Sequence, residues 1–157
     1  MTHQDYNKDT ASEIIAGFGN RPEMLVQILR AFMDHFGWIR SEAVRQLAQE
    51  LNLSRADVHG VVSYYHDFRT SPTGKHVVKI CEAEACQSMG SRDLAEHAKK
   101  SLGMDMHESN ADMTLEPVYC LGNCACSPAI MVDGKTYGRV SSERFDEIVA
   151  QAKGASS

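Results

Sequence analysis

Four of the five cysteines lie in two close pairs in the second half of the chain. Cys81 and Cys86 enclose four residues, whereas Cys120 and Cys124 enclose three. Each pair begins at the end of a predicted strand and continues into a predicted loop. Loops at strand ends can bring residues that are distant in sequence together over one edge of a scaffold. Because thiolates are strong metal ligands, these four cysteines are the candidate ligands of a metal centre.

Three kinds of site compete for this set of thiols. A structural zinc site with four cysteines usually has a gap of two residues within at least one pair, and neither pair has that gap. Disulfides are disfavoured in a reducing cytosol, which is the compartment that we expect for this chain. A [2Fe–2S] cluster takes two thiolates on each iron, and wider gaps suit a loop that must also wrap the bridging sulfides. The spacing favours the cluster and leaves zinc open as the alternative.

Glycines accompany both pairs, since Gly90 follows the first pair and Gly122 lies within the second. Four thiolates on two irons leave negative charge on the site. Backbone N–H groups that point at sulfur offset this charge, and glycine lets the backbone come close. Both glycines suit ordinary turns equally well, so they support the cluster without deciding for it.

Composition excludes several classes of function. Acidic residues outnumber basic ones by 21 to 16, the net charge is -5, and no cluster of lysine and arginine offers a surface for nucleic acid. The first eight residues lack the apolar core of a signal peptide, and no apolar run is long enough to cross a bilayer. We therefore expect a cytoplasmic chain with no direct membrane insertion. At 157 residues the chain is too short to hold a flavin domain and a molybdenum domain as well.

Residues 1–70 are predicted to form an N-terminal helical bundle. Apolar residues recur there at helical spacing in four segments. Pro22 suits the first turn of the second helix, where its missing N–H costs little. Ser54 and Asp57 resemble a capping box with a shorter acid than usual. The first predicted helix covers residues 11–18, and the second runs from Pro22 to a stop at Gly37. The third starts near Ser41, and the fourth starts after Ser54.

Residues 75–153 alternate short apolar runs with helical patterns, which predicts a small α/β domain. Asp133 and Gly134 are a strong hairpin signal, and Pro117 is expected to break the second strand. The order β-α-β-β-α resembles that of thioredoxin. Because a helical bundle precedes this domain, the predicted fold class of the whole chain is α+β. The predicted strands are 77–80, 114–119, 129–132 and 135–137, and the predicted helix caps are Ser91 and either Ser141 or Ser142.

The cysteine pattern resembles that of a known family. The segment Cys120-Leu121-Gly122-Asn123-Cys124, with Pro128 nearby, together with the Cys81 to Cys86 pair, is similar to the thioredoxin-like [2Fe–2S] ferredoxins. This family includes the small ferredoxin subunit of NADH:quinone oxidoreductase (complex I), subunits of NAD-reducing hydrogenases and the gamma subunit of NAD-dependent formate dehydrogenases. The resemblance covers residues 21–149. It implies that one [2Fe–2S] cluster is held by Cys81, Cys86, Cys120 and Cys124.

Three local features are most similar to the gamma subunit of NAD-dependent formate dehydrogenases. This branch implies an electron-transfer subunit that has no catalytic residues of its own. The implied partners are a subunit that binds FMN and NAD and a catalytic subunit that carries iron–sulfur clusters and a molybdenum cofactor. Formate oxidation to carbon dioxide, with reduction of NAD, would take place in those partners. The three features are 53–61 with Tyr65-His66, 81–90, and Cys124-Ala125-Cys126-Ser127-Pro128.

The remaining candidate residues have plainer interpretations beside the functional ones. Cys126 is expected to be a buried thiol that does not bind the cluster, although exchange with Cys124 is conceivable. His59 and His66 are expected to have structural or interface roles, because no third metal ligand is evident. Thiol-exchange chemistry is rejected because no Cys-x-x-Cys spacing is present. Three aromatic residues form a further group, namely Tyr64, Tyr65 and Phe68. We give equal weight to a place in the bundle core and to a role in docking a partner subunit.

Overall fold

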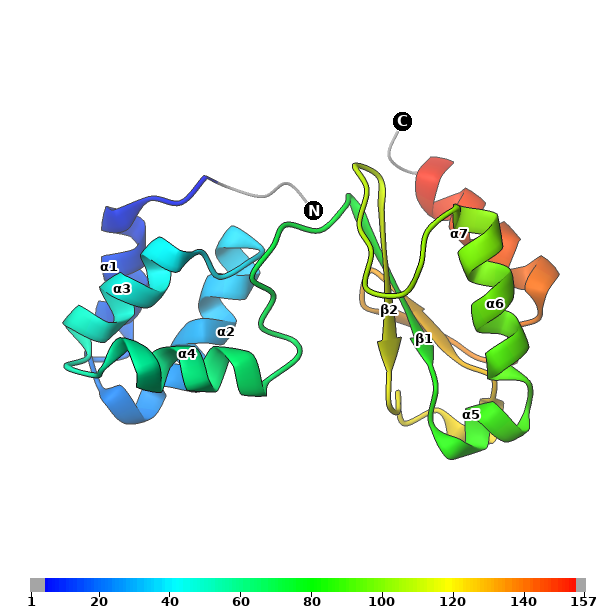
Figure 1. Cartoon of the computed structure of the whole chain (residues 1–157), viewed down its shortest axis with the longest axis horizontal. Coiled ribbons are helices and arrows are strands. Elements are labelled where there is room, and N and C mark those ends of the chain that lie inside the picture. The colour runs from blue at the N-terminus through cyan, green and yellow to red at the C-terminus, as the bar shows by residue number, and fades with distance from the viewer. Residues whose placement is uncertain (1–4, 155–157) are drawn as a thin grey trace. The chain divides into compact units, whose positions relative to one another are not determined.

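The chain forms two compact units that divide between Pro72 and Thr73. The computed structural model describes residues 5–154. The part of the first unit that it describes is built from helices, and the second unit combines a four-stranded sheet with helices (Figure 1). Within residues 5–154, no helix has the length and apolar character that crossing a membrane requires.

The helices of the first unit pack around a shared apolar core. Phe32, Phe36 and Leu47 are among its largest fully buried side chains. Two edge-to-face aromatic contacts, of Phe36 with Phe32 and with His35, lie in or beside it. The core therefore joins residues that are far apart in sequence. The helices are α1 (Lys8–Gly17), the 3-10 turn η1 (Pro22–Met24), α2 (Leu25–Phe36), α3 (Ser41–Glu50) and α4 (Arg55–Tyr64).

Local signals decide where these helices begin and end. Helix α1 starts earlier than predicted, because the side chain of Asn7 accepts hydrogen bonds from the N–H groups of Asp9 and Thr10. Pro22 lies in the 3-10 turn before α2 rather than in α2 itself. Gly37 ends α2 in a left-handed conformation with φ of 79°, as predicted.

The predicted capping box before α4 is confirmed. The N–H of Asp57 donates to the hydroxyl of Ser54 at 3.0 Å, and the N–H of Ser54 donates to the carboxylate of Asp57 at 3.1 Å. Two N–H groups that the helix itself cannot satisfy thus find partners. The shorter side chain of aspartate still closes the box.

The sheet of the second unit has the strand order β2-β1-β3-β4. Strand β1 pairs in parallel with β2 and antiparallel with β3, and β3 and β4 form the predicted hairpin. Helices α6 (Ser91–Leu102) and α7 (Ser142–Gly154) lie side by side against the sheet and share one apolar core with it (Figure 1). The strands are β1 (His76–Cys81), β2 (Met113–Val118), β3 (Ile130–Val132) and β4 (Lys135–Tyr137).

Pro117 does not break β2, contrary to the prediction. The strand runs through it, and Pro117 stays in register opposite Ile80. Strand β2 lies at the edge of the sheet, and the N–H of Leu115 points outward to the carbonyl of Glu108. Pro117 is two residues further along and so has the same orientation. Its missing N–H therefore faces away from β1 and costs the ladder nothing.

The predicted caps of the two long helices have different outcomes. Ser91 is the first residue of α6 rather than its cap, and Gly90 occupies the cap position with φ of 91°. The side chain of Ser91 is buried instead. Before α7, the hydroxyl of Ser141 accepts from the N–H of Arg144 at 3.3 Å, which confirms one of the two predicted caps.

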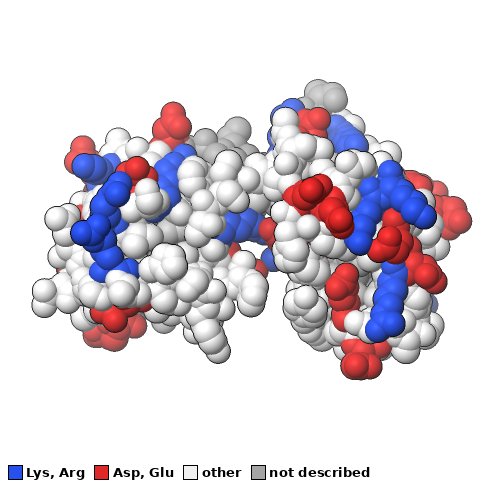
Figure 2. All heavy atoms as spheres, in the orientation of Figure 1, with Lys and Arg blue, Asp and Glu red and all other residues white. Residues whose placement is uncertain are grey.

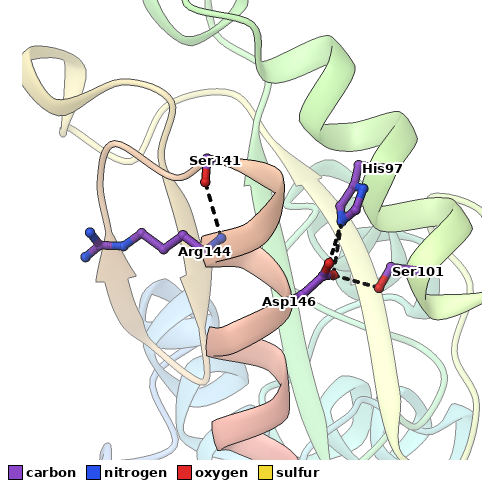
Figure 3. A network of polar contacts seen from close by, with 5 residues as sticks. All are labelled: His97, Ser101, Ser141, Arg144 and Asp146. Atoms are coloured by element: carbon purple, nitrogen blue, oxygen red, sulfur yellow. Dashed lines mark hydrogen bonds and ion pairs between the residues drawn. The ribbon is translucent and has the colours of Figure 1, made fainter.

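A polar cluster joins α6 to α7 (Figure 3). Nε2 of His97 lies 3.0 Å from both carboxylate oxygens of Asp146, and the hydroxyl of Ser101 donates to Asp146 at 2.8 Å. Partial burial acts to raise the pKa of Asp146, but the Ser101 and His97 hydrogen bonds outweigh it and lower the pKa. The charged form of Asp146 therefore favours the folded state.

Acidic and basic side chains are close together on the second unit. Figure 2 shows both signs interspersed over its visible face. The ammonium of Lys99, for example, lies 2.8 Å from Glu96 and 3.3 Å from Asp105. These exposed pairs neutralise one another locally, and each contributes little to stability.

Replacing Asp146 by asparagine should weaken the packing of α7 on α6. The contribution of the carboxylate is complete above the ordinary aspartate pKa of about 3.9 and is lost as the pH falls through the lowered pKa of the folded state. At pH 7 we expect Asp146→Asn to cost about 0.5–1 kcal/mol, because the side chain is partly exposed and screened. Urea unfolding followed by NMR at residues of α6 and α7 measures this cost.

Glu147→Gln is the matched control, because it removes one charge from the neighbouring exposed position of α7. It should leave the unfolding of α6 and α7 unchanged. Equal unfolding midpoints for Asp146→Asn and Glu147→Gln would contradict a stabilising role for the cluster.

Candidate metal centre

The two cysteine pairs sit where strands β1 and β2 end. Cys81 is the last residue of β1, and Cys86 lies in the short helix α5 (Glu84–Ser88). Cys120 follows β2, and Cys124 begins the 3-10 turn η2 (Cys124–Cys126). Helix α5 was not predicted, because five residues without a side-chain cap carry no periodic signal. The first pair therefore spans a strand end and a helix rather than a plain loop.

Within each pair the two sulfurs are close. Sγ of Cys120 lies 3.9 Å from Sγ of Cys124, and the thiols of Cys81 and Cys86 shift the pKa values of each other. A metal ion with tetrahedral angles and bonds to sulfur of about 2.3 Å holds two sulfurs about 3.8 Å apart. The second pair is thus spaced as ligands of one metal ion would be.

The two pairs also meet each other. The backbone N–H of Leu121, between Cys120 and Cys124, acts to lower the pKa of Cys81. Leu121 and Val118 pack against the small apolar group around Cys81 and Cys86. The structure therefore brings all four predicted ligands to one end of the sheet.

The two pairs differ in burial. Cys81 and Cys86 are 2% and 1% exposed, whereas Cys120 and Cys124 lie at the surface. A centre held by all four sulfurs would have one protected side and one side near solvent.

Burial and hydrogen bonds move the thiol pKa values in different directions. Burial raises the pKa of Cys81, and the N–H groups of Ala83 and Leu121 oppose that rise. Burial acts in the same direction on Cys86, but its hydrogen bonds outweigh burial and lower the pKa. A hydrogen bond with Cys120 raises the pKa of Cys124. Metal binding must therefore displace protons from thiols that share them in pairs.

Backbone N–H groups point at the sulfurs, as the cluster hypothesis requires. The N–H of Gly122 donates to Sγ of Cys120 at 3.3 Å, and Gly122 has a left-handed φ of 71° that glycine adopts readily. The N–H of Ala129 acts to lower the pKa of Cys86. Gly90 has the ordinary structural role that was the alternative for both glycines, because it caps α6. These donors offset negative charge on bound thiolates.

Two pairs of cysteines are the donor set at this end of the sheet. Among residues 5–154, no three cysteine, histidine, aspartate or glutamate side chains surround a single point closely enough for one ion. Two linked pairs are what a di-iron cluster takes, with two thiolates on each iron. The donor set and its N–H groups therefore fit a [2Fe–2S] cluster.

Cys126 takes no part in this sulfur arrangement in the portion of the chain that the structure describes. It is half-buried in η2 and packs against Gly138. A Cβ at Gly138 would lie 2.6 Å from Cβ of Cys126 and 2.7 Å from its carbonyl oxygen. Only glycine lets the segment after β4 come this close to η2, which we call the cysteine turn.

The other candidate residues lie in the first unit, and within residues 5–154 they belong to no group of three side chains that could hold a metal ion. His59 is on α4, whereas His66 lies beyond the end of that helix, and both are exposed. Tyr64 and Tyr65 are exposed and stack edge to face, with ring centroids 5.0 Å apart. Phe68 packs partly against the helical core, so the aromatic group divides between core and surface.

A family model for thioredoxin-like [2Fe–2S] ferredoxins matches residues 11–153. The chain belongs to the thioredoxin-like [2Fe–2S] ferredoxin family. Its cofactor is accordingly a [2Fe–2S] cluster, as the cysteine spacing indicated, and the zinc alternative is set aside.

The relatives include components of larger enzymes. The chain is 32% identical over 117 residues to the E subunit of the NADH-quinone oxidoreductase of Pseudomonas aeruginosa, covering 73% of this chain and 70% of that protein. It is 30% identical over 129 residues to the HndA subunit of the NADP-reducing hydrogenase of Solidesulfovibrio fructosivorans, covering 81% and 75%.

The fold also occurs in a solved structure of an NAD+-reducing [NiFe]-hydrogenase in the air-oxidized state. The TM-score is 0.70 at 17% sequence identity, and the match covers 84% of this chain. It covers only 23% of the hydrogenase chain, so this protein spans about a quarter of its length. At this identity the likeness shows a shared fold alone.

Replacing Gly138 by alanine should disturb the cysteine turn. The added methyl group overlaps Cys126, and such overpacking costs about 1–3 kcal/mol. We expect the purified Gly138→Ala protein to hold less iron and sulfide per chain than wild type. Gly60→Ala is the control, because nothing lies within 4 Å of a Cβ at that helical position. Equal cluster content in the two variants would contradict the close-packing role of Gly138.

Proposed function

We propose that this chain is an electron-transfer subunit whose [2Fe–2S] cluster is bound by Cys81, Cys86, Cys120 and Cys124. The observation that carries the proposal is the meeting of the two cysteine pairs at one end of the sheet, where Leu121 of the second pair packs against the group around Cys81 and Cys86. Two thiols from each of two loops supply the four ligands that the cluster needs. The division into a helical bundle over residues 1–70 and a cluster domain over 75–153 forms part of the proposal.

When bound, the cluster supplies one-electron transfer. The chain's own residues set the conditions for it. The burial of Cys81 and Cys86 excludes water from one side, and the exposure of Cys120 and Cys124 leaves the other side open to a partner. The N–H of Gly122 and the peptide groups around it offset the negative charge that reduction adds.

The partner that we propose is a cytoplasmic subunit that binds FMN and NAD. A one-electron carrier beside a flavin can hold one electron while the flavin exchanges two. The names of the two relatives, one from an NADH-quinone oxidoreductase and one from an NADP-reducing hydrogenase, support a nicotinamide-linked complex. No substrate site is proposed in this chain itself.

We assign the complex to the NAD-dependent formate dehydrogenases, with this chain as the gamma subunit. Support comes mainly from the sequence features at 81–90 and 124–128, because the feature at 53–61 is shared more widely in the family. Cys126 is the sharpest of them, because complex I relatives usually lack a cysteine at its place. The catalytic partner would then carry iron–sulfur clusters and a molybdenum cofactor and convert formate and NAD+ to carbon dioxide and NADH.

A second candidate function is the equivalent subunit of complex I or of an NAD-reducing hydrogenase. The sequence identities of 32% and 30% to such subunits favour it. Both candidates share the same cluster and the same kind of flavin partner. They differ in the catalytic subunit of the complex.

Single replacement of each proposed ligand by alanine tests the ligand set. Each change leaves one iron short of a thiolate, so the paramagnetic signal of the reduced cluster should be lost or strongly diminished. Electron paramagnetic resonance of the dithionite-reduced proteins measures this signal against protein concentration.

Cys126→Ala is the matched control for these four variants, since it removes a neighbouring thiol from the same turn. Its signal should equal that of wild type. A lost signal in Cys126→Ala with a retained signal in Cys124→Ala would show that the ligand assignment is wrong.

Purification of the native complex through a tag on this chain distinguishes the two candidate functions. We expect FMN and molybdenum to co-purify, together with formate-dependent reduction of NAD+. Nickel in the complex, or co-purification of membrane-embedded subunits without molybdenum, would reject formate dehydrogenase in favour of the second candidate.

A further inference from the structure

Ser127 connects the two cysteine pairs from a buried position. Ser127 is 8% exposed as a residue and precedes Pro128. The sulfur of Cys86 lies 3.5 Å from the Ser127 hydroxyl, and that hydroxyl donates to the carbonyl of Cys124 at 2.7 Å. One small polar side chain thus touches a ligand of the first pair and the backbone of the second.

The hydroxyl of Ser127 has one proton and therefore one hydrogen bond to donate. With Cys86 as a thiol, the S–H group donates to Ser127, and Ser127 donates its own proton to the carbonyl of Cys124. A cysteine that ligates iron has lost its thiol proton. The Cys86 sulfur then only accepts, and it competes with the Cys124 carbonyl for the Ser127 proton.

The charge on the sulfur decides this competition. Hydrogen bonds to an ionised acceptor are roughly twice as strong as those between neutral groups. Cys124 is exposed, so water can satisfy its carbonyl once Ser127 turns away. Cys86 is buried, and its sulfur has no such access to water.

We propose that Ser127 is a positioning residue that donates its hydroxyl proton to the Cys86 sulfur in the cluster-bound protein and thereby raises the reduction potential of the cluster. This inference rests on the proposed ligand set. A donor to a ligand sulfur stabilises the reduced form more than the oxidised form, because reduction adds negative charge to the site.

Ser127→Ala in the full chain with its cluster tests the proposal. We expect its midpoint potential to fall by up to about 59 mV, which is tenfold in the ratio of reduced to oxidised protein for a one-electron couple. Ser88→Ala is the matched control. The Ser88 hydroxyl donates to the carbonyl of Ala85 on the same short helix as Cys86, so its removal should leave the potential unchanged.

Redox titration monitored by electron paramagnetic resonance gives these potentials, with iron and sulfide content measured on the same samples. Ser127→Thr keeps the hydroxyl and should restore a potential close to that of wild type. An unchanged potential in Ser127→Ala at full cluster content overturns the proposal. Folded Ser127→Ala that holds no cluster also overturns it and makes Ser127 a structural residue of the turn.

The same samples separate this inference from the ligand assignment. Wild type without two irons and two sulfides per chain would refute the proposed function itself. Wild type with its full cluster and a Ser127→Ala potential equal to wild type would refute only the role of Ser127.

Discussion

The parallel pairing of β1 with β2 determines where every part of the proposed centre lies. Parallel strands end at the same edge of a sheet, and Cys81 lies opposite Val118 at that edge. The N–H of Glu82 donates to the carbonyl of Val118 at 2.8 Å, so a hydrogen bond also joins the chain at the ends of β1 and β2. The segments that follow therefore meet, although about forty residues separate them along the chain. An antiparallel pairing would have placed the two cysteine pairs at opposite ends.

The meeting produces a centre whose two halves differ in environment. Cys81 and Cys86 are held by the sheet, by α5 and by an apolar lining, whereas Cys120 and Cys124 belong to a surface turn. Ser127 bridges the halves, and Leu121 packs against the buried half. A protected side and an exposed side are what an electron carrier needs, because the cofactor must be shielded from water and still come close to its partner.

Much of the fold could be predicted from the sequence, and the failures have physical causes. Gly37, the Ser54–Asp57 box and the Asp133-Gly134 hairpin depend on local chemistry that the sequence displays. The course of β2 through Pro117 depends on its place at the sheet edge, which local sequence does not reveal. Helix α5 is too short for periodicity, and the burial of Ser91 depends on tertiary packing. The gathering of the four cysteines at one end of the sheet could be predicted from their places after two strands, but the contacts of Ser127 could not, because no motif marks them.

Binding of a [2Fe–2S] cluster by this chain alone is the point on which the proposed function stands. Iron, zinc and acid-labile sulfide determined on the anaerobically purified single chain, with Mössbauer spectroscopy of the same sample, provide its sharpest test. We expect about two irons and two sulfides per chain, in two antiferromagnetically coupled ferric sites with tetrahedral sulfur ligands. A colourless protein that binds about one zinc per chain and no iron would refute cluster binding.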